Sequence, residues 1–220
     1  MTRTYLEQQT GDEKHDASAT SVAEVLDALY DDVLAVSPDR VSDPDRDRFY
    51  LSKGHGPQAY HAVLARHGYF SPDLLPGFGG ADSPLGHHPD RLRLPGAEIS
   101  SGSLGHGLAL AVGSAIALRS QARTARVVVL VGDAELDEGS NHEAIAVAGR
   151  FGLSRLTAVV VDNNSASHGW PGGIAARFAL EGWVIRDVDA ADRPELVTAL
   201  RATDAAAPTV VVVHTDPKGA

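Results

Sequence analysis

Runs of consecutive apolar residues constrain the fold of this chain more than any other feature of its sequence. Such runs occupy residues 127–131, 157–161 and 209–213. The run at 209–213 shows no alternation with polar residues, so we expect a strand that is buried on both faces. Strands of this kind are typical of parallel sheets with helices packed on both sides. The sequence therefore predicts an α/β fold with a doubly wound, mainly parallel sheet and helices on both faces.

The spacing of the other apolar residues predicts the elements that surround these strands. Helical periodicity predicts helices at 19–34, 57–67, 103–119, 138–151 and 194–203. Short strands at 49–51 and 183–188 add to the predicted sheet. Residues 71–99 are rich in Pro, Gly and Asp and predict a long loop, which inside a domain is usually functional or disordered. We expect a polar N-terminal arm at 1–13 and a single domain at 14–220.

Composition and charge argue against several classes of function. The chain of 220 residues carries a net charge of −10 and no basic stripe, which argues against nucleic-acid binding. It has no cysteine, so disulfides and thiolate metal sites are excluded. No apolar run approaches the roughly 18 residues of a membrane span. The first 16 residues lack the apolar core of a secretory signal, so we expect a cytoplasmic protein.

Polar residues follow two of the apolar runs directly. Asp133 follows the run at 127–131, one residue beyond Gly132, and Asn163 follows the run at 157–161. Ligands of open parallel sheets bind at the carboxyl ends of the strands, so we expect these two side chains to lie close together. A carboxylate, an amide oxygen and a main-chain carbonyl suit a hard divalent cation such as Mg²⁺. The alternative interpretation is a turn aspartate and a helix-capping asparagine.

Further motifs lie in a fixed order along the chain, and together with the two polar sites they resemble the N-terminal, thiamine diphosphate-binding part of transketolases. The resemblance covers nearly the whole chain, from about His15 to Gly219. The segments that carry it are residues 48–56 (RFYLSKGHG), 85–89 (LGHHP), 101–107 (SGSLGHG), 132–139 (GDAELDEG), 162–163 (DN) and 215–219 (TDPKG).

The resemblance implies that the chain binds thiamine diphosphate together with Mg²⁺ or Ca²⁺. The metal ligands that it implies are the side chains of Asp133 and Asn163 and the main-chain carbonyl of Ser165. Free N–H groups at a helix start favour anions, and the sequence predicts that Gly102-Ser103-Leu104 opens a helix. The cofactor-binding residues implied in this way are His55, Gly102, Ser103, Leu104, Asp133, Ala134, Glu135 and Asn163. Ala134 stands where the family usually has glycine.

The catalytic residues that the resemblance implies are His15, His55, His87, Glu138 and Glu143. The three histidines would line the path to the reactive carbon of the cofactor, where an imidazole can donate, accept and transfer protons. The two glutamates would lie at an interface that links two active sites. The alternative for them is a solvated helix with acidic residues near its N-terminus. We interpret His67 and His88 as surface residues.

The chain lacks the second, pyrimidine-binding domain that supplies the activating glutamate in this family. We therefore expect a diphosphate-binding subunit of a two-component transketolase, completed by a separate pyrimidine-binding subunit, with an α2β2 heterotetramer as the expected assembly. The implied reaction transfers a two-carbon ketol (glycolaldehyde) unit from a ketose, with a phosphorylated ketose as an assumption, to an acceptor. The expected partners are small-molecule substrates and that second subunit, with no nucleic acid and no membrane.

Alternative functions stay open at the level of sequence. One is a subunit of another thiamine diphosphate enzyme, similar to deoxyxylulose-phosphate synthase or to a 2-oxo acid dehydrogenase. The Ser-Lys-Gly-His and Gly-Ser-Leu-Gly segments favour transketolase over both. Another is a non-catalytic binding or regulatory relative, against which the retention of Asp133, Asn163, His55 and His87 argues.

Overall fold

A parallel sheet forms the centre of the molecule in the computed structural model, which describes residues 2–9, 16–54 and 56–215. The strand order is β1-β2-β3-β5-β4, and every neighbouring pair is parallel. This arrangement confirms the predicted doubly wound sheet. The strands are β1 (Arg48–Leu51), β2 (Val127–Gly132), β3 (Leu156–Asp162), β4 (Val184–Asp189) and β5 (Thr209–His214).

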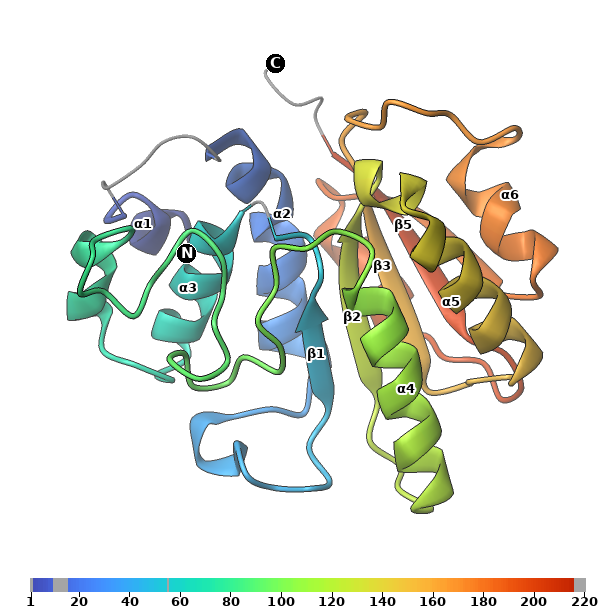
Figure 1. Cartoon of the computed structure of the whole chain (residues 1–220), viewed down its shortest axis with the longest axis horizontal. Coiled ribbons are helices and arrows are strands. Elements are labelled where there is room, and N and C mark those ends of the chain that lie inside the picture. Colours follow the sequence, from blue (N-terminus) through green and yellow to red (C-terminus); the bar gives the residue numbers. More distant parts are fainter. Residues whose placement is uncertain (1, 10–15, 55, 216–220) are drawn as a thin grey trace.

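Helices cover both faces of the sheet, as Figure 1 shows. One face packs against α2 (Asp16–Ala28), α3 (Pro57–Arg66) and α7 (Arg193–Arg201). The other face packs against α4 (Gly107–Ser120), α5 (Gly139–Arg150) and α6 (Gly173–Leu180).

The side chains of the central strands alternate between the two cores. Val128 and Leu130 of β2 belong to the core under α2, α3 and α7, whereas Val129 and Val131 belong to the core under α4, α5 and α6. Every residue of β2 is buried. The unbroken apolar runs thus supply a side chain to each face in turn, which is the period of an extended strand.

The segment predicted as a polar arm contains a short helix, α1 (Thr2–Leu6), that packs against α3. Thr2 is buried and its hydroxyl donates to the carboxylate of Asp27 in α2. Beyond the helix, the amide of Gln9 donates to the carbonyl oxygen of Gln58 at 2.7 Å. Polar anchors therefore hold residues 2–9 against the domain, and the division of the chain at residue 13 stays a prediction.

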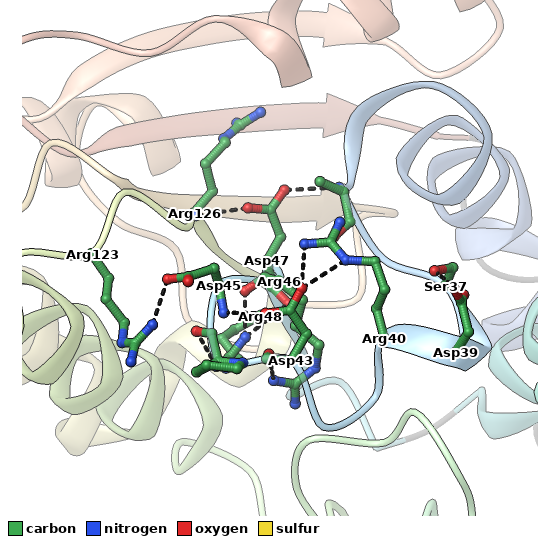
Figure 2. Close-up of polar contacts among 12 residues, drawn as sticks. Ser37, Asp39, Arg40, Asp43, Asp45, Arg46, Asp47, Arg48, Arg123 and Arg126 are labelled. Atoms are coloured by element: carbon green, nitrogen blue, oxygen red, sulfur yellow. Dashed lines mark hydrogen bonds and ion pairs between the residues drawn. The ribbon is translucent and has the colours of Figure 1, made fainter.

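A charged connection leads from α2 to β1 and fastens the amino ends of β1 and β2 (Figure 2). A π-helical turn (Leu29–Val33) ends α2, and a 3-10 turn (Pro38–Arg40) follows. The buried carboxylate of Asp47 accepts hydrogen bonds from the Arg126 amide at 2.8 Å and from the Ala35 amide at 2.9 Å. Asp47 therefore joins the start of β1 to the residue that precedes β2.

Two elements differ from the expectation. The long loop at 71–99 contains a 3-10 turn (Pro72–Gly77), and α6 lies in a stretch for which the sequence pattern gave no helix. Across the described part of the chain, no helix combines the length and the apolar character needed to cross a lipid bilayer.

His61 lies at the centre of α3, and its side chain is 0% exposed. Neither ring nitrogen has a hydrogen-bond partner among the described residues, and the ring lies 5.9 Å from that of Phe78. Burial lowers the pKa of His61 from 6.5 to about 3. The folded protein therefore holds a neutral imidazole at this position.

We expect this histidine to make the fold sensitive to acid. Between pH 6.5 and about 3 the unfolded chain binds a proton that the folded chain excludes. The free energy of unfolding should thus fall as the pH drops, by up to about 1.4 kcal/mol per pH unit. Above pH 6.5 both states are neutral and this contribution is flat.

His61→Phe removes this linkage, because phenylalanine does not titrate. Urea unfolding of the wild type and of the variant at pH 8 and pH 5 measures the effect, and the values at pH 8 serve as the internal control. The wild type should lose stability relative to His61→Phe at pH 5. An equal difference at both pH values would contradict a buried neutral imidazole.

Candidate active site

The carboxyl edge of the sheet, at the top of Figure 1, brings together segments that are far apart in the sequence. Residues 52–54 follow β1, residues 133–138 follow β2 and residues 163–166 follow β3. The loop at 102–106 precedes α4 and reaches the same edge through its contacts with Ser52 and Glu135. The segments with predicted chemistry thus converge on one edge, as the strand directions require.

Asp133 and the loop after β3 are in direct contact. The Asp133 side chain is 3% exposed, and its amide donates to the carbonyl oxygen of Val161 at 3.0 Å. Its carboxylate accepts hydrogen bonds from the Ser165 amide at 2.6 Å, the Ser165 hydroxyl at 2.6 Å and the Ala166 amide at 3.0 Å. The two predicted metal-binding segments are therefore adjacent.

Asn163 presents an unsatisfied acceptor at the same place. The side chain is 1% exposed, and its Nδ2 donates to the hydroxyl of Ser21 in α2 at 3.4 Å. Its Oδ1 is buried without a hydrogen-bond partner among the described residues. Buried acceptors are rarely left unsatisfied, so this oxygen fits a ligand that a cation would provide.

The oxygen donors at this edge fit a hard divalent cation, because they comprise the Asp133 carboxylate and the unsatisfied Asn163 Oδ1. The described residues contain no group of three His, Cys, Asp or Glu side chains that could hold a metal. A cation here would therefore depend on amide and main-chain oxygens, and on the diphosphate itself. Ser165 directs its amide and hydroxyl toward Asp133, and its carbonyl stays a predicted ligand.

Lys53 and Ser21 are residues of this edge to which the sequence patterns assign no role. The Lys53 ammonium donates to the Ser21 hydroxyl at 3.0 Å, and its side chain is largely buried. Its methylene groups pack within 3.4 Å of the position that a Cβ atom would take at Gly132. A buried ammonium next to the Gly-Asp turn provides positive charge where a diphosphate would bind.

The expectation that Gly102-Ser103-Leu104 opens a helix is wrong, because α4 begins at Gly107. Gly102 has φ of 125° and Gly105 has φ of 83°, values that a right-handed helix excludes. The segment forms a turn ahead of the helix. The amides of Ser103 and Leu104 make no hydrogen bond to any other described residue, so both are open to an anionic ligand.

The histidines fall into separate environments. The His87 ring lies edge-on to Phe78, with 5.5 Å between ring centroids. His88, which we interpreted as a surface residue, donates from Nδ1 to the carbonyl oxygen of Gly54 at 2.8 Å. A Cβ atom at Gly102 would lie 2.8 Å from the His88 ring. His88 therefore contacts two of the site's loops, whereas His15 and His55 lie outside the described residues.

Ala134 and Glu135 begin a 3-10 turn (Ala134–Asp137), where Ala134 has a negative φ that any residue adopts. The Glu135 side chain is 2% exposed and turns into the protein rather than toward a ligand. Its carboxylate accepts hydrogen bonds from the Ser52 hydroxyl and from the Gly105 amide. Burial raises the pKa of Glu135 above its ordinary value. The prediction that Glu135 binds the cofactor is therefore not supported by the direction of its side chain.

Glu138 and Glu143 lie at the start of α5 and are both exposed. Exposed Val147, one turn beyond Glu143, extends this surface of α5. Leu110 and Phe151 are also exposed on the same side of the sheet. Acidic groups beside exposed apolar side chains fit the predicted interface as well as a solvated helix.

The comparison with protein families decides the identity of this fold and site. Residues 7–216 match the family model described as "Transketolase, thiamine diphosphate binding domain". The chain belongs to the transketolase family. The fold of this transketolase domain is also that of solved transketolases: the enzyme from Leishmania mexicana superposes with a TM-score of 0.79 at 26% identity, covering 91% of this chain and 36% of the other.

Relatives of this transketolase domain carry several names. The protein named Ferredoxin fas2 of Rhodococcoides fascians is 56% identical over 191 residues, which cover 86% of this chain and 63% of that protein. A subunit of the apulose-4-phosphate transketolase of Actinobacillus succinogenes is 41% identical over 150 residues, covering 68% and 54%. The 6-deoxy-6-sulfo-D-fructose transketolase subunit SqwG of a Clostridium species is 34% identical over 209 residues, covering 91% and 76%. The chain thus spans less than two thirds of the first two of these relatives.

Proposed function

We propose that this transketolase domain binds the diphosphate of thiamine diphosphate through a divalent cation, Mg²⁺ or Ca²⁺, at the carboxyl edge of its sheet. The observation that carries the proposal is the junction of Asp133 with residues 163–166, beside the unsatisfied Asn163 Oδ1. Asp133, Asn163 and the Ser165 carbonyl would hold the cation. The free amides of Ser103 and Leu104, with Gly102 beside them, would bind phosphate oxygens.

Bound thiamine diphosphate supplies a carbon nucleophile for breaking and forming the C–C bond next to a carbonyl. The residues of this chain would position the cofactor and the substrate and move protons around them. His87 and His88 sit on the loop beside Gly54 and Gly102, where an imidazole would donate to or accept from substrate hydroxyl groups. The same role is proposed for His15 and His55.

The reaction that we propose is transfer of a two-carbon ketol unit from a ketose, phosphorylated in the simplest case, to an acceptor. A separate pyrimidine-binding subunit would complete the active site in an α2β2 heterotetramer. Support comes from relatives that are named as transketolase subunits, including those of the apulose-4-phosphate transketolases from two bacteria. The exposed Glu138 and Glu143 would lie in the interface that joins two active sites.

Affinity purification of the tagged chain from its native host, with thiamine diphosphate and Mg²⁺ present, tests this proposal. We expect a stoichiometric second chain with a pyrimidine-type domain, identified by mass spectrometry. The purified complex should act on ketose donors in preference to 2-oxo acids. Preference for 2-oxo acids would indicate another thiamine diphosphate enzyme, and loss of both partner and cofactor would indicate a non-catalytic relative.

A further inference from the structure

Glu135 is a buried acid that connects segments from different parts of the chain. Its Oε1 accepts hydrogen bonds from the Ser52 hydroxyl, after β1, and from the Gly105 amide at 3.0 Å, ahead of α4. Its Oε2 lies 3.4 Å from the amide nitrogen of Gly132, at the end of β2. One carboxylate thus receives donors from each of three segments at the carboxyl edge of the sheet.

Ser52 extends these connections into α4. Its Oγ, which donates to Glu135, also accepts a hydrogen bond from the Gly107 amide at 3.0 Å. The main chain of Glu135 makes a further link, because its carbonyl oxygen accepts from Asn141 Nδ2 of α5 at 2.6 Å. Glu135 therefore connects the first turns of α4 and α5 to the ends of β1 and β2.

The loop that Glu135 holds is also closely packed from the other side. The Ser140 hydroxyl donates to the Gly105 carbonyl oxygen at 2.7 Å. A Cβ atom at Gly105 would lie 2.5 Å from Ser140 Oγ and 2.7 Å from Glu138 Cβ. Gly105 thus lies between its hydrogen bond to Glu135 and the start of α5, and the neighbouring amides of Ser103 and Leu104 depend on this position for their direction.

We propose that Glu135 is a positioning residue, which holds the loop at 102–106 against the ends of β1 and β2 so that its free amides face the diphosphate. This inference rests on the proposed function, because it assigns the loop a role toward that cofactor. Glu135 acts through Gly105 and Ser52 and does not itself contact the ligand. A glutamine at this position keeps a carbonyl oxygen for the Ser52 and Gly105 donors, whereas an alanine keeps neither acceptor.

The experiment compares Glu135→Ala with Glu135→Gln, and uses Glu195→Ala, an exposed glutamate of α7, as the matched control. Calorimetric titration of the full chain, or of its complex with the partner subunit, with thiamine diphosphate and Mg²⁺ measures affinity. Hydrogen exchange of the unliganded protein measures the loop directly. We expect Glu135→Ala to weaken cofactor binding about tenfold to a hundredfold, in line with the loss of hydrogen bonds to a charged group.

The exchange pattern separates a positioning role from a general loss of stability. Peptides over residues 102–108 should exchange faster in Glu135→Ala, whereas β5 should exchange as in the wild type. Glu135→Gln should restore most of the affinity. Ser52→Ala gives the same test in a milder form if Glu135→Ala fails to fold, with faster exchange at 102–108 and weaker binding than the wild type.

Two outcomes are decisive in opposite ways. A wild-type chain that binds no thiamine diphosphate, alone or with its partner, would refute the proposed function, whereas the exchange data would still report on Glu135. Unchanged affinity and unchanged exchange at 102–108 in Glu135→Ala, or in Ser52→Ala where that variant replaces it, would overturn the positioning role.

Discussion

Replacing Asp133 by alanine is expected to abolish metal-dependent binding of thiamine diphosphate. The substitution removes the one carboxylate among the proposed ligands and also frees the Ser165 and Ala166 donors that it now binds. Loss of an outer-shell partner of a metal already lowers affinity by about 10- to 100-fold, so loss of the ligand should exceed that range. Ketol transfer by the assembled enzyme should fall with cofactor occupancy.

Titration of the variant with thiamine diphosphate at fixed Mg²⁺ measures this effect. Asp39→Ala is the control, because Asp39 is an exposed aspartate on the 3-10 turn that precedes β1. Asp133→Asn keeps the size of the side chain but loses its charge, and we expect it to bind the cofactor more weakly than the wild type. Binding of wild-type strength in Asp133→Ala would show that the metal site lies elsewhere.

Replacing Gly107 by alanine is expected to destabilise the fold by about 3 kcal/mol or to prevent folding. A Cβ atom at this position would lie 2.3 Å from both Cβ and Oγ of Ser52 and 2.8 Å from Ser52 Cα. The first turn of α4 and the end of β1 must then separate. This movement also breaks the hydrogen bond from the Gly107 amide to Ser52 Oγ.

Gly113→Ala in the same helix is the matched control for Gly107→Ala. A Cβ atom at Gly113 meets no other atom within 4 Å, so the substitution should raise helix stability by up to about 1 kcal/mol. Urea unfolding of both variants measures the contrast. Similar stabilities for the two would contradict the close approach of α4 to β1.

The sheet and the pairing of its polar ends were predictable, because both follow from local sequence. Unbroken apolar runs predict buried parallel strands, and parallel strands place Asp133 and residues 163–166 at one edge. The strand–helix–strand unit from β2 to β3 was confirmed with boundaries that differ by one or two residues. No long-range information was needed for these features.

The start of α4 and the direction of Glu135 were not predictable, since both depend on tertiary contacts. The apolar and small residues after Ser103 predict one helix, but the positive φ of Gly105 delays the helix to Gly107. Glu135 turns inward because Ser52 and Gly105 offer donors that no sequence pattern reveals. α6 was missed because its eight residues, with Ile174 and Phe178 as inward-facing apolar side chains, are too few for a clear period.

The strand β1 is short, yet it is fixed to β2 at both ends. At its start, Asp47 accepts a hydrogen bond from the Arg126 amide, and at its end the Ser52 and Lys53 amides both donate to the Leu130 carbonyl oxygen, at 2.9 and 3.1 Å. A strand fastened in this way cannot slide along its neighbour by one residue. Any opening that admits or releases a cofactor must then take place in the loops, while the distance between the residues after β1 and those after β2 stays constant through each catalytic cycle.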